Sequence, residues 1–224
     1  MRLALFDLDN TLVDRAGAFR RSVERLQHDL GTESPDFVKF VVDADQDGAA
    51  GWLSWMRAAQ ERFGFGGDVA ALVEEHHRRY LESFTVEPDV VEALHELHAN
   101  GWRVVIVTNG PPTQLEVAQR CGVLHAVDDC LVSAVVGVRK PDPAIFVLAA
   151  QRVGADLGHD TAWMVGDNPS ADIGGAVAVG IGSIWISRGR RWTEPSFAPT
   201  ETVDVIAEAF DRLAGAHDVD RAGS

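Results

Sequence analysis

The hydrophobic residues of this chain fall into short apolar runs, and these runs predict the strands of a sheet. One run begins at Leu3, and others span Trp102 to Val107, Val132 to Val138, Thr161 to Val165 and Ser183 to Ser187. Short runs of this kind, bounded by turn residues, are typical of strands buried on both faces. Beyond residue 88 each helical segment follows a strand, which predicts an α/β fold with a parallel sheet.

Between the first two strands the hydrophobic residues recur with the period of a helix. Phe19, Val23 and Leu26 lie three or four residues apart and predict one helix with an apolar face. The same period predicts further helices near residues 36–42, 49–63 and 68–84. The sequence therefore predicts a Rossmann-like core of residues 1–13 and 86–224, interrupted by an all-helical domain of residues 14–85.

Start signals predict the helices that follow the later strands. Thr113 and Glu116 have the spacing of a capping box, in which the first hydroxyl bonds to the helix backbone. Asp142 before Pro143 is a second start signal. A final helix is expected near residues 201–213.

Polar side chains follow the predicted strands. Asp7 and Asp9 follow the first strand, where their spacing predicts a shared face and mutual repulsion unless a cation lies between them. In open parallel α/β sheets, ligands bind at the carboxyl ends of the strands, so these residues belong to one site. The polar residues after the other strands are Thr108, Asn109, Lys140, Asp167 and Asp172.

In order and spacing these segments resemble the haloacid dehalogenase (HAD) superfamily of hydrolases, specifically its phosphatase branch with a helical C1-type cap. The marks of that family are Asp-x-Asp-x-Thr, a later Thr or Ser, a downstream Lys, and Gly-Asp-x-x-x-x-Asp. This chain carries them from Asp7, at Thr108, at Lys140 and from Gly166. The resemblance covers roughly residues 1–187, and residues 14–85 occupy the position at which the family's caps are inserted.

The resemblance implies a role for each of these residues. Asp7 would be the nucleophile that forms an aspartyl-phosphate, and Asp9 would be the general acid and base. Lys140 would hold Asp7 and, together with Thr108 and Asn109, bind the phosphoryl group. The implied cofactor is Mg²⁺, and its ligands would be Asp7, the backbone carbonyl of Asp9, Asp167 and, through a water molecule, Asp172.

The presence of a carboxyl group at Asp9 also distinguishes between the reactions that this family catalyses. A phosphatase needs an acid to protonate the departing alkoxide, whereas the dehalogenases that resemble this chain lack that carboxylate and need no magnesium. We therefore expect a magnesium-dependent phosphatase that hydrolyses a small phosphorylated metabolite. The alternatives are a phosphomutase of the same superfamily, a haloacid dehalogenase, and a regulatory protein that binds phosphorylated ligands without turnover.

The composition and net charge of the chain limit the kinds of molecule that it is expected to bind. The 224 residues are 46% hydrophobic, which is enough for a full core, and the formal charge of −14 opposes binding to nucleic acid or to anionic membranes. Met1 and Arg2 lead straight into the first strand, so no signal peptide is expected and the predicted location is cytoplasmic. Cys121 and Cys130 are expected to be free thiols. The chain is expected to be a monomer or a homodimer.

Within the expected cap, Trp52, Trp55 and Arg57 have side chains that suit contact with a leaving group. The two tryptophans are equally suited to packing inside the cap, where aromatic residues bury a large apolar area. The sequence leaves these two interpretations open.

Overall fold

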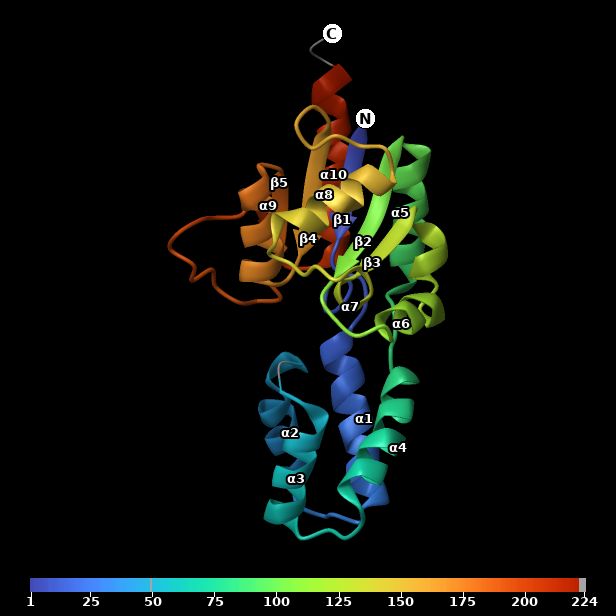
Figure 1. Ribbon diagram of the computed structural model, residues 1–224, viewed down its shortest axis with the longest axis vertical. Coiled ribbons are helices and arrows are strands. Elements are labelled where there is room, and N and C mark those ends of the chain that lie inside the picture. The colour runs from blue at the N-terminus through green and yellow to red at the C-terminus, as the bar shows by residue number, and fades with distance from the viewer. Residues whose placement is uncertain (49, 222–224) are drawn as a thin grey trace. The chain divides into compact units, whose positions relative to one another are not determined.

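The computed structural model describes residues 1–48 and 50–221 of the chain, with side chains up to residue 215, and Figure 1 traces its elements. It divides the chain into two compact units. The first comprises Met1–Val13 and Val86–Ser224, and the second comprises Asp14–Thr85. The first unit contains a sheet with helices on both faces, and the described part of the second unit is helical.

The sheet of the first unit has six strands in the order β3-β2-β1-β4-β5-β6, and every neighbouring pair is parallel. The central strand β1 has Phe6 opposite Ile106 of β2 and Val165 of β4. The side chains of residues 3–6 are all fully buried, because a central strand is covered on both faces. The α/β prediction is confirmed. The strands are β1 (Arg2–Phe6), β2 (Trp102–Thr108), β3 (Asp129–Val132), β4 (Thr161–Gly166), β5 (Gly182–Ile186) and β6 (Glu201–Val203).

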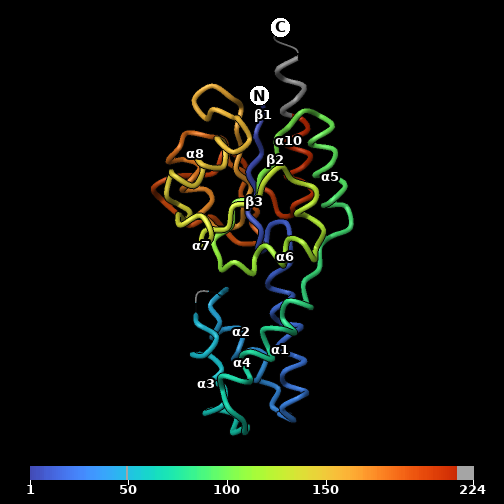
Figure 2. The backbone as a smooth tube through the Cα atoms, turned by 45° about the vertical axis from the view of Figure 1, so that its right-hand side comes forward, coloured from blue at the N-terminus to red at the C-terminus, as the bar shows by residue number. Residues whose placement is uncertain are grey.

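Helices cover both faces of this sheet, with α8 and α9 on one face and α5 and α10 on the other (Figure 2). Alternate residues of β1 serve the two faces: Leu5 joins a core with Phe146 of α8, and the ring of Phe6 lies 5.5 Å from that of Phe210 of α10. The helices of this unit are α5 (Pro88–Ala99), α6 (Gln114–Arg120), α7 (Ser133–Val136), α8 (Pro143–Arg152), α9 (Gly175–Val179) and α10 (Ile206–Arg221).

Three local predictions are wrong. The run Val132 to Val138 is not a strand: β3 ends at Val132, and the next four residues form α7, since a short apolar run does not distinguish strand from helix. Glu201–Val203 forms the edge strand β6, which is too short to leave a pattern, so the last helix begins only at Ile206. Thr113 precedes α6 without a side-chain capping bond.

The second unit contains the predicted helices α1 (Arg15–Asp29), α2 (Phe37–Asp45), α3 (Trp52–Phe63) and α4 (Val69–Leu81). Asp14 begins α1 by accepting a hydrogen bond from the Gly17 amide at 2.8 Å, which satisfies one unpaired helical N–H. A buried ion pair joins α1 to α2, with 2.7 Å between Arg15 Nη2 and Asp45 Oδ2.

Aromatic rings form the core of this helical unit. Trp55 is 1% exposed and packs edge-on against Phe19 at 5.8 Å and against His76 at 5.3 Å. Trp52 is half-buried and contacts Tyr80 at 5.1 Å, whereas Arg57 is exposed. Of the two interpretations of the tryptophans, packing within the unit is the one observed for Trp55.

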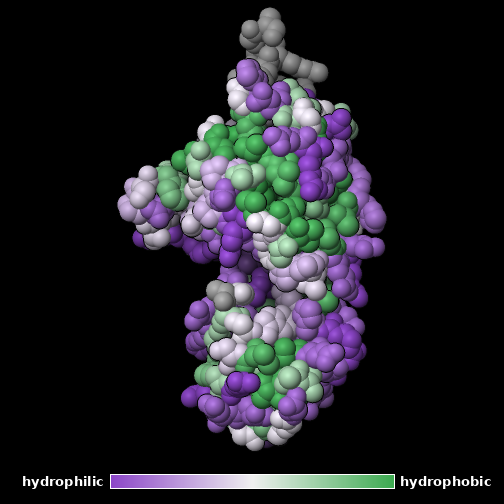
Figure 3. Space-filling model, viewed as in Figure 1, coloured by the Kyte–Doolittle hydropathy of each residue, from purple (hydrophilic) through white to green (hydrophobic). Residues whose placement is uncertain are grey.

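The surface mixes residue types, and Figure 3 shows hydrophobic and hydrophilic residues side by side on the visible face of each unit. Among the described residues, no helix combines the length and apolar character that crossing a bilayer requires. Cys121 and Cys130 are free thiols, as expected, and burial raises their pKa values to about 11 and about 12. These thiols therefore stay protonated at neutral pH.

His76 predicts a pH dependence of stability. Burial, with a smaller contribution from His77, lowers the pKa of His76 to about 4, whereas an unfolded histidine titrates near 6.5. Above pH ~6.5 both states are neutral and the stability is fully present. As the pH falls towards 4, the unfolded state alone gains a proton, and between pH 7.5 and 5 we expect a loss of about 2 kcal/mol.

Urea unfolding at these two pH values, followed by tryptophan fluorescence, measures the effect. The His76→Phe variant keeps an aromatic ring and lacks the titrating group, so its stability should fall by about 2 kcal/mol less than that of the wild type over the same range. An equal fall in both proteins would contradict the prediction.

Candidate active site

Four segments bring polar residues to the carboxyl ends of the central strands. Asp7 directly follows β1, Thr108 is the last residue of β2, and Asp167 directly follows β4. The Asp7 amide donates to the Val165 carbonyl at 2.9 Å, which extends the strand pairing by one residue and fixes the backbone of Asp7. Lys140 comes from the segment between α7 and α8.

Lys140 lies at the centre of these segments and is 2% exposed. Its ammonium donates to Asp7 Oδ1 at 2.7 Å and to Asp172 Oδ1 at 2.6 Å. Burial alone would lower the pKa of Lys140, but the carboxylates of Asp172 and Asp7 raise it above its usual value. The ammonium therefore stays charged and ties two carboxylates from different elements together.

Asn109 holds the backbone of Lys140. Its Oδ1 accepts from the Lys140 amide at 2.9 Å, and its Nδ2 donates to the Lys140 carbonyl at 2.8 Å. Its Nδ2 keeps a second hydrogen, and the phosphate contact predicted for Asn109 remains a prediction. Thr108 is 1% exposed beside it, and its phosphate contact remains a prediction.

Asp172 is fully buried in a π-helical turn, Pro169–Gly174. Its Oδ2 accepts from the Asn168 amide at 2.9 Å, and the Asn168 side chain in turn accepts from the first amides of the turn. A Cβ atom on Gly166 would lie 2.2 Å from Asp172 Oδ2. Only glycine at that position allows Asp172 to approach the end of β4 this closely.

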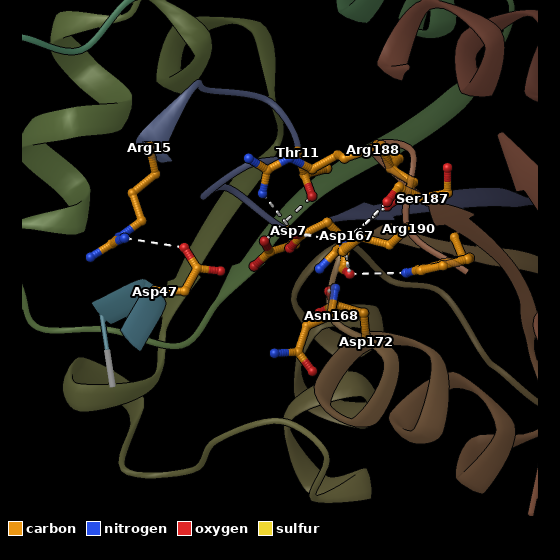
Figure 4. A network of polar contacts seen from close by, with 12 residues as sticks. Asp7, Thr11, Arg15, Asp47, Asp167, Asn168, Asp172, Ser187, Arg188 and Arg190 are labelled. Carbon is orange, nitrogen blue, oxygen red and sulfur yellow. Dashed lines mark hydrogen bonds and ion pairs between the residues drawn. The ribbon is translucent and has the colours of Figure 1, made fainter. Parts of the chain in front are cut away.

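Asp7, Asp167 and Asp172 form a compact carboxylate cluster in the first unit (Figure 4). One oxygen atom of each lies within 4.8 Å of an oxygen atom of the others. Burial, together with the nearby Asp7 carboxylate, raises the pKa of Asp167 to about 6, although Arg190 and Arg188 oppose the rise. Burial likewise raises the pKa of Asp172, against the effect of Lys140. Buried carboxylates that resist ionisation in this way favour a bound cation.

This cluster fits the donor chemistry of a divalent cation such as Mg²⁺, which prefers a few carboxylate oxygens and completes its shell with water or phosphate. Asp7 and Asp167 would supply such oxygens directly, and Asp172, whose two oxygens already accept from Lys140 and Asn168, would act through a water molecule. The backbone carbonyl of Asp9 remains a predicted part of the shell.

Asp9 does not share a strand face with Asp7, so that part of the spacing argument is wrong. β1 ends at Phe6, and the backbone then turns, with the amides of Leu12 and Val13 both donating to the Leu8 carbonyl at 3.0 Å. The Asp9 carboxylate instead accepts a hydrogen bond from Gln114 Nε2 at 2.7 Å. In the part of the chain that the structure describes, the carboxylate cluster is formed without Asp9.

Three residues of this region were missed by sequence reasoning. Arg188 and Arg190 both donate to Asp167 Oδ2, at 3.2 Å and 3.0 Å, as Figure 4 shows. The signal in the sequence is the basic cluster of residues 188–191, which follows the last predicted strand. Gln114 carried only the signal of the capping pattern around it, and its contact with Asp9 depends on the fold.

A sequence model of a known family matches this chain over residues 1–180, and the family is described as haloacid dehalogenase-like hydrolase. The chain is 35% identical to a ribulose-1,5-bisphosphate 5-phosphatase of Halopiger xanaduensis, over 94% of this chain and 90% of that protein. It is also 28% identical to an (S)-2-haloacid dehalogenase of a Pseudomonas species, over 89% of this chain and 90% of the relative.

The fold has solved counterparts. The crystal structure of the HAD-hydrolase YfnB from Bacillus subtilis, bound to magnesium, superposes with a TM-score of 0.77 at 22% sequence identity. The match covers 95% of this chain and 98% of that structure. At 22% sequence identity this similarity is evidence for a shared fold alone.

Replacing Lys140 tests the electrostatic organisation of the site. In Lys140→Met, Asp7 and Asp172 stay buried without their ammonium partner, so we expect the free energy of unfolding to fall by about 3–5 kcal/mol in metal-free buffer. Adding Asp172→Asn should recover part of the loss, because it removes one of the unpaired charges. Urea unfolding measures all three proteins.

Lys39→Met is the matched control, because Lys39 forms an exposed ion pair with Asp43. Surface pairs of this kind contribute at most about 1 kcal/mol. Equal effects of the two lysine substitutions would contradict the assigned role of Lys140.

Proposed function

This chain belongs to the haloacid dehalogenase-like hydrolases, and from that premise we propose that it is a magnesium-dependent phosphatase acting through an aspartyl-phosphate intermediate. The observation that carries the proposal is Asp7, held by Lys140 at 2.7 Å, with a second carboxyl group two residues further along the chain. The first group can act as nucleophile and the second as acid and base.

In the first half of the reaction, a carboxylate oxygen of Asp7 attacks phosphorus and the bond from phosphorus to the ester oxygen breaks. Asp9 in its acid form transfers its proton to the departing alkoxide. Lys140 orients Asp7 and offsets the charge of the transferred phosphoryl group, with Thr108 at the end of β2 as a further donor.

In the second half, the Asp9 carboxylate accepts a proton from water while the water oxygen attacks phosphorus. The bond from phosphorus to Asp7 breaks, which releases inorganic phosphate and restores both side chains. Asp7 and Asp167, with Asp172 through a water molecule, would hold Mg²⁺, which would supply positive charge to offset that of the phosphoryl group.

The proposed substrate is a small phosphorylated metabolite. The relative from Halopiger xanaduensis is named for a sugar bisphosphate, so sugar phosphates come first in a panel, followed by phosphoglycolate-like acids and nucleoside monophosphates. In this proposal residues 14–85 act as a cap that excludes water from the reaction. We further propose that the protein is cytoplasmic and is a monomer or a homodimer.

Two other reactions of the superfamily have distinct products. A phosphomutase would produce a bisphosphate intermediate instead of free phosphate. A haloacid dehalogenase, the reaction named for the Pseudomonas relative, would release halide from an (S)-2-haloacid and would not need Asp9. Assays for phosphate, bisphosphate and halide on one protein preparation separate the three.

The substrate panel tests the proposal directly. We expect phosphate release from at least one ester with Mg²⁺, loss of that release with excess EDTA, and a fall of at least about 10³-fold in Asp7→Asn, which removes the nucleophile. If no ester is turned over faster by the wild type than by Asp7→Asn, the proposed function is wrong.

Arg188 should weaken Mg²⁺ binding. Its guanidinium donates to Asp167, one of the carboxylates that would hold the cation, and its positive charge would repel a cation there. Arg190 also donates to the carbonyls of Asp167 and Ser187 and lies over the Trp185 ring, so it has a structural role as well. We expect Arg188→Met to bind Mg²⁺ about three- to tenfold more tightly, measured by isothermal titration calorimetry.

Arg191→Met is the control for this measurement, because Arg191 is exposed two residues beyond Gly189 in the same segment. Its Mg²⁺ affinity should equal that of the wild type. Weaker binding in Arg188→Met would instead mean that Arg188 holds Asp167 in the orientation that the cation needs.

A further inference from the structure

We infer that Gln114 is a positioning residue that holds the Asp9 carboxyl group ready for proton transfer to the leaving group. The inference rests on the proposed function and adds to it a residue outside the family's marks. Gln114 is the first residue of α6 and lies 105 positions from Asp9 in sequence. It is 7% exposed, and its Nε2 donates to Asp9 Oδ2 at 2.7 Å.

The Gln114 side chain fits where it does because residue 110 is a glycine. A Cβ atom on Gly110 would lie 2.6 Å from Gln114 Cγ and 2.8 Å from its Nε2, so any larger residue at 110 would displace the side chain. The Gln114 amide donates to the Pro111 carbonyl at 3.1 Å, which fixes the start of α6. The side chain therefore reaches Asp9 from a rigid position.

Asp9 needs such a partner because its backbone and its side chain are fixed by different means. The turn around Leu8 and the positive φ of Asn10 determine where the backbone of Asp9 lies. The rotamer of its side chain is a separate degree of freedom. A bond from a buried amide restricts that rotamer, and correct orientation of a reacting group contributes strongly to catalysis.

The chemistry of an amide restricts Gln114 to an indirect role. Its NH₂ group neither releases nor accepts a proton at neutral pH, so it acts only through Asp9. The bond from Gln114 Nε2 to Asp9 Oδ2 therefore orients the carboxyl group and leaves the proton transfer to Asp9 itself.

Two aryl phosphates of similar shape test this role. Phenolate is a strong base, with a pKa near 10 for its conjugate acid as in tyrosine, and it needs a proton when it leaves. 4-Nitrophenolate is a far weaker base and leaves unaided. The kcat/KM value covers the steps up to transfer of the phosphoryl group to Asp7, so it isolates the step in which Asp9 acts as an acid.

In Gln114→Met we expect kcat/KM for phenyl phosphate to fall by about tenfold or more, because general acid catalysis contributes 10²–10⁴-fold. The value for 4-nitrophenyl phosphate should change by less than about threefold. Asp9→Asn should show the same selectivity with a larger loss. Gln119→Met, an exposed change on the same helix, should leave both values unchanged.

The ratio of the two values within one variant is insensitive to the fraction of folded protein, so a partly unfolded variant still gives a decisive result. Equal losses on both esters would overturn the inference and point to a role in phosphate binding or folding. An unchanged phenyl phosphate value would overturn it as well. If wild type and Asp7→Asn hydrolyse both esters equally slowly, the inference fails, and the substrate panel decides separately whether the proposed function fails with it.

Discussion

A single buried ammonium group organises the polar centre of this protein. Lys140 bonds to Asp7 at the end of β1 and to Asp172 in the turn after β4, at distances below 2.8 Å. Without it, buried carboxylates would face one another unpaired, which is costly in a region of low polarity. The surrounding structure serves this contact: Asn109 holds the lysine backbone on both sides, and Gly166 lets Asp172 approach.

The ammonium does not neutralise the site by itself. Lys140 pairs with two of the three clustered carboxylates, and burial, together with the nearby Asp7 carboxylate, raises the pKa of the third, Asp167. Arg188 and Arg190, in the segment after β5, both donate to Asp167 and offset part of the negative charge of the cluster. A divalent cation would also offset this negative charge, and it would then share the Asp167 carboxylate with the two arginines. The charge around Asp167 therefore bears both on the stability of the fold and on the proposed binding of a cation.

The parallel sheet explains why distant segments supply one site. Every strand of the sheet runs in the same direction, so residues that follow β1, β2 and β4 meet at one edge. Apolar runs and the polar residues after them are local features, and they were sufficient to predict the α/β fold and to select Asp7 and Asp167. The run before Lys140 is not a strand, so Lys140 was selected correctly only through the family's marks. Where the local pattern was short or ambiguous, as at α7 and β6, prediction from the sequence was wrong.

The sequence by itself determined the fold class, the family marks and the identity of the residues that gather at the strand ends, because hydrophobic period and motif spacing are properties of neighbouring positions. Only the tertiary structure decided how those side chains are used. It turned Asp9 away from the strand direction and towards Gln114, engaged the Asn109 amide with Lys140, and brought Arg188 to Asp167. Such contacts join residues far apart in the chain, and they exist only once the sheet has assembled around them.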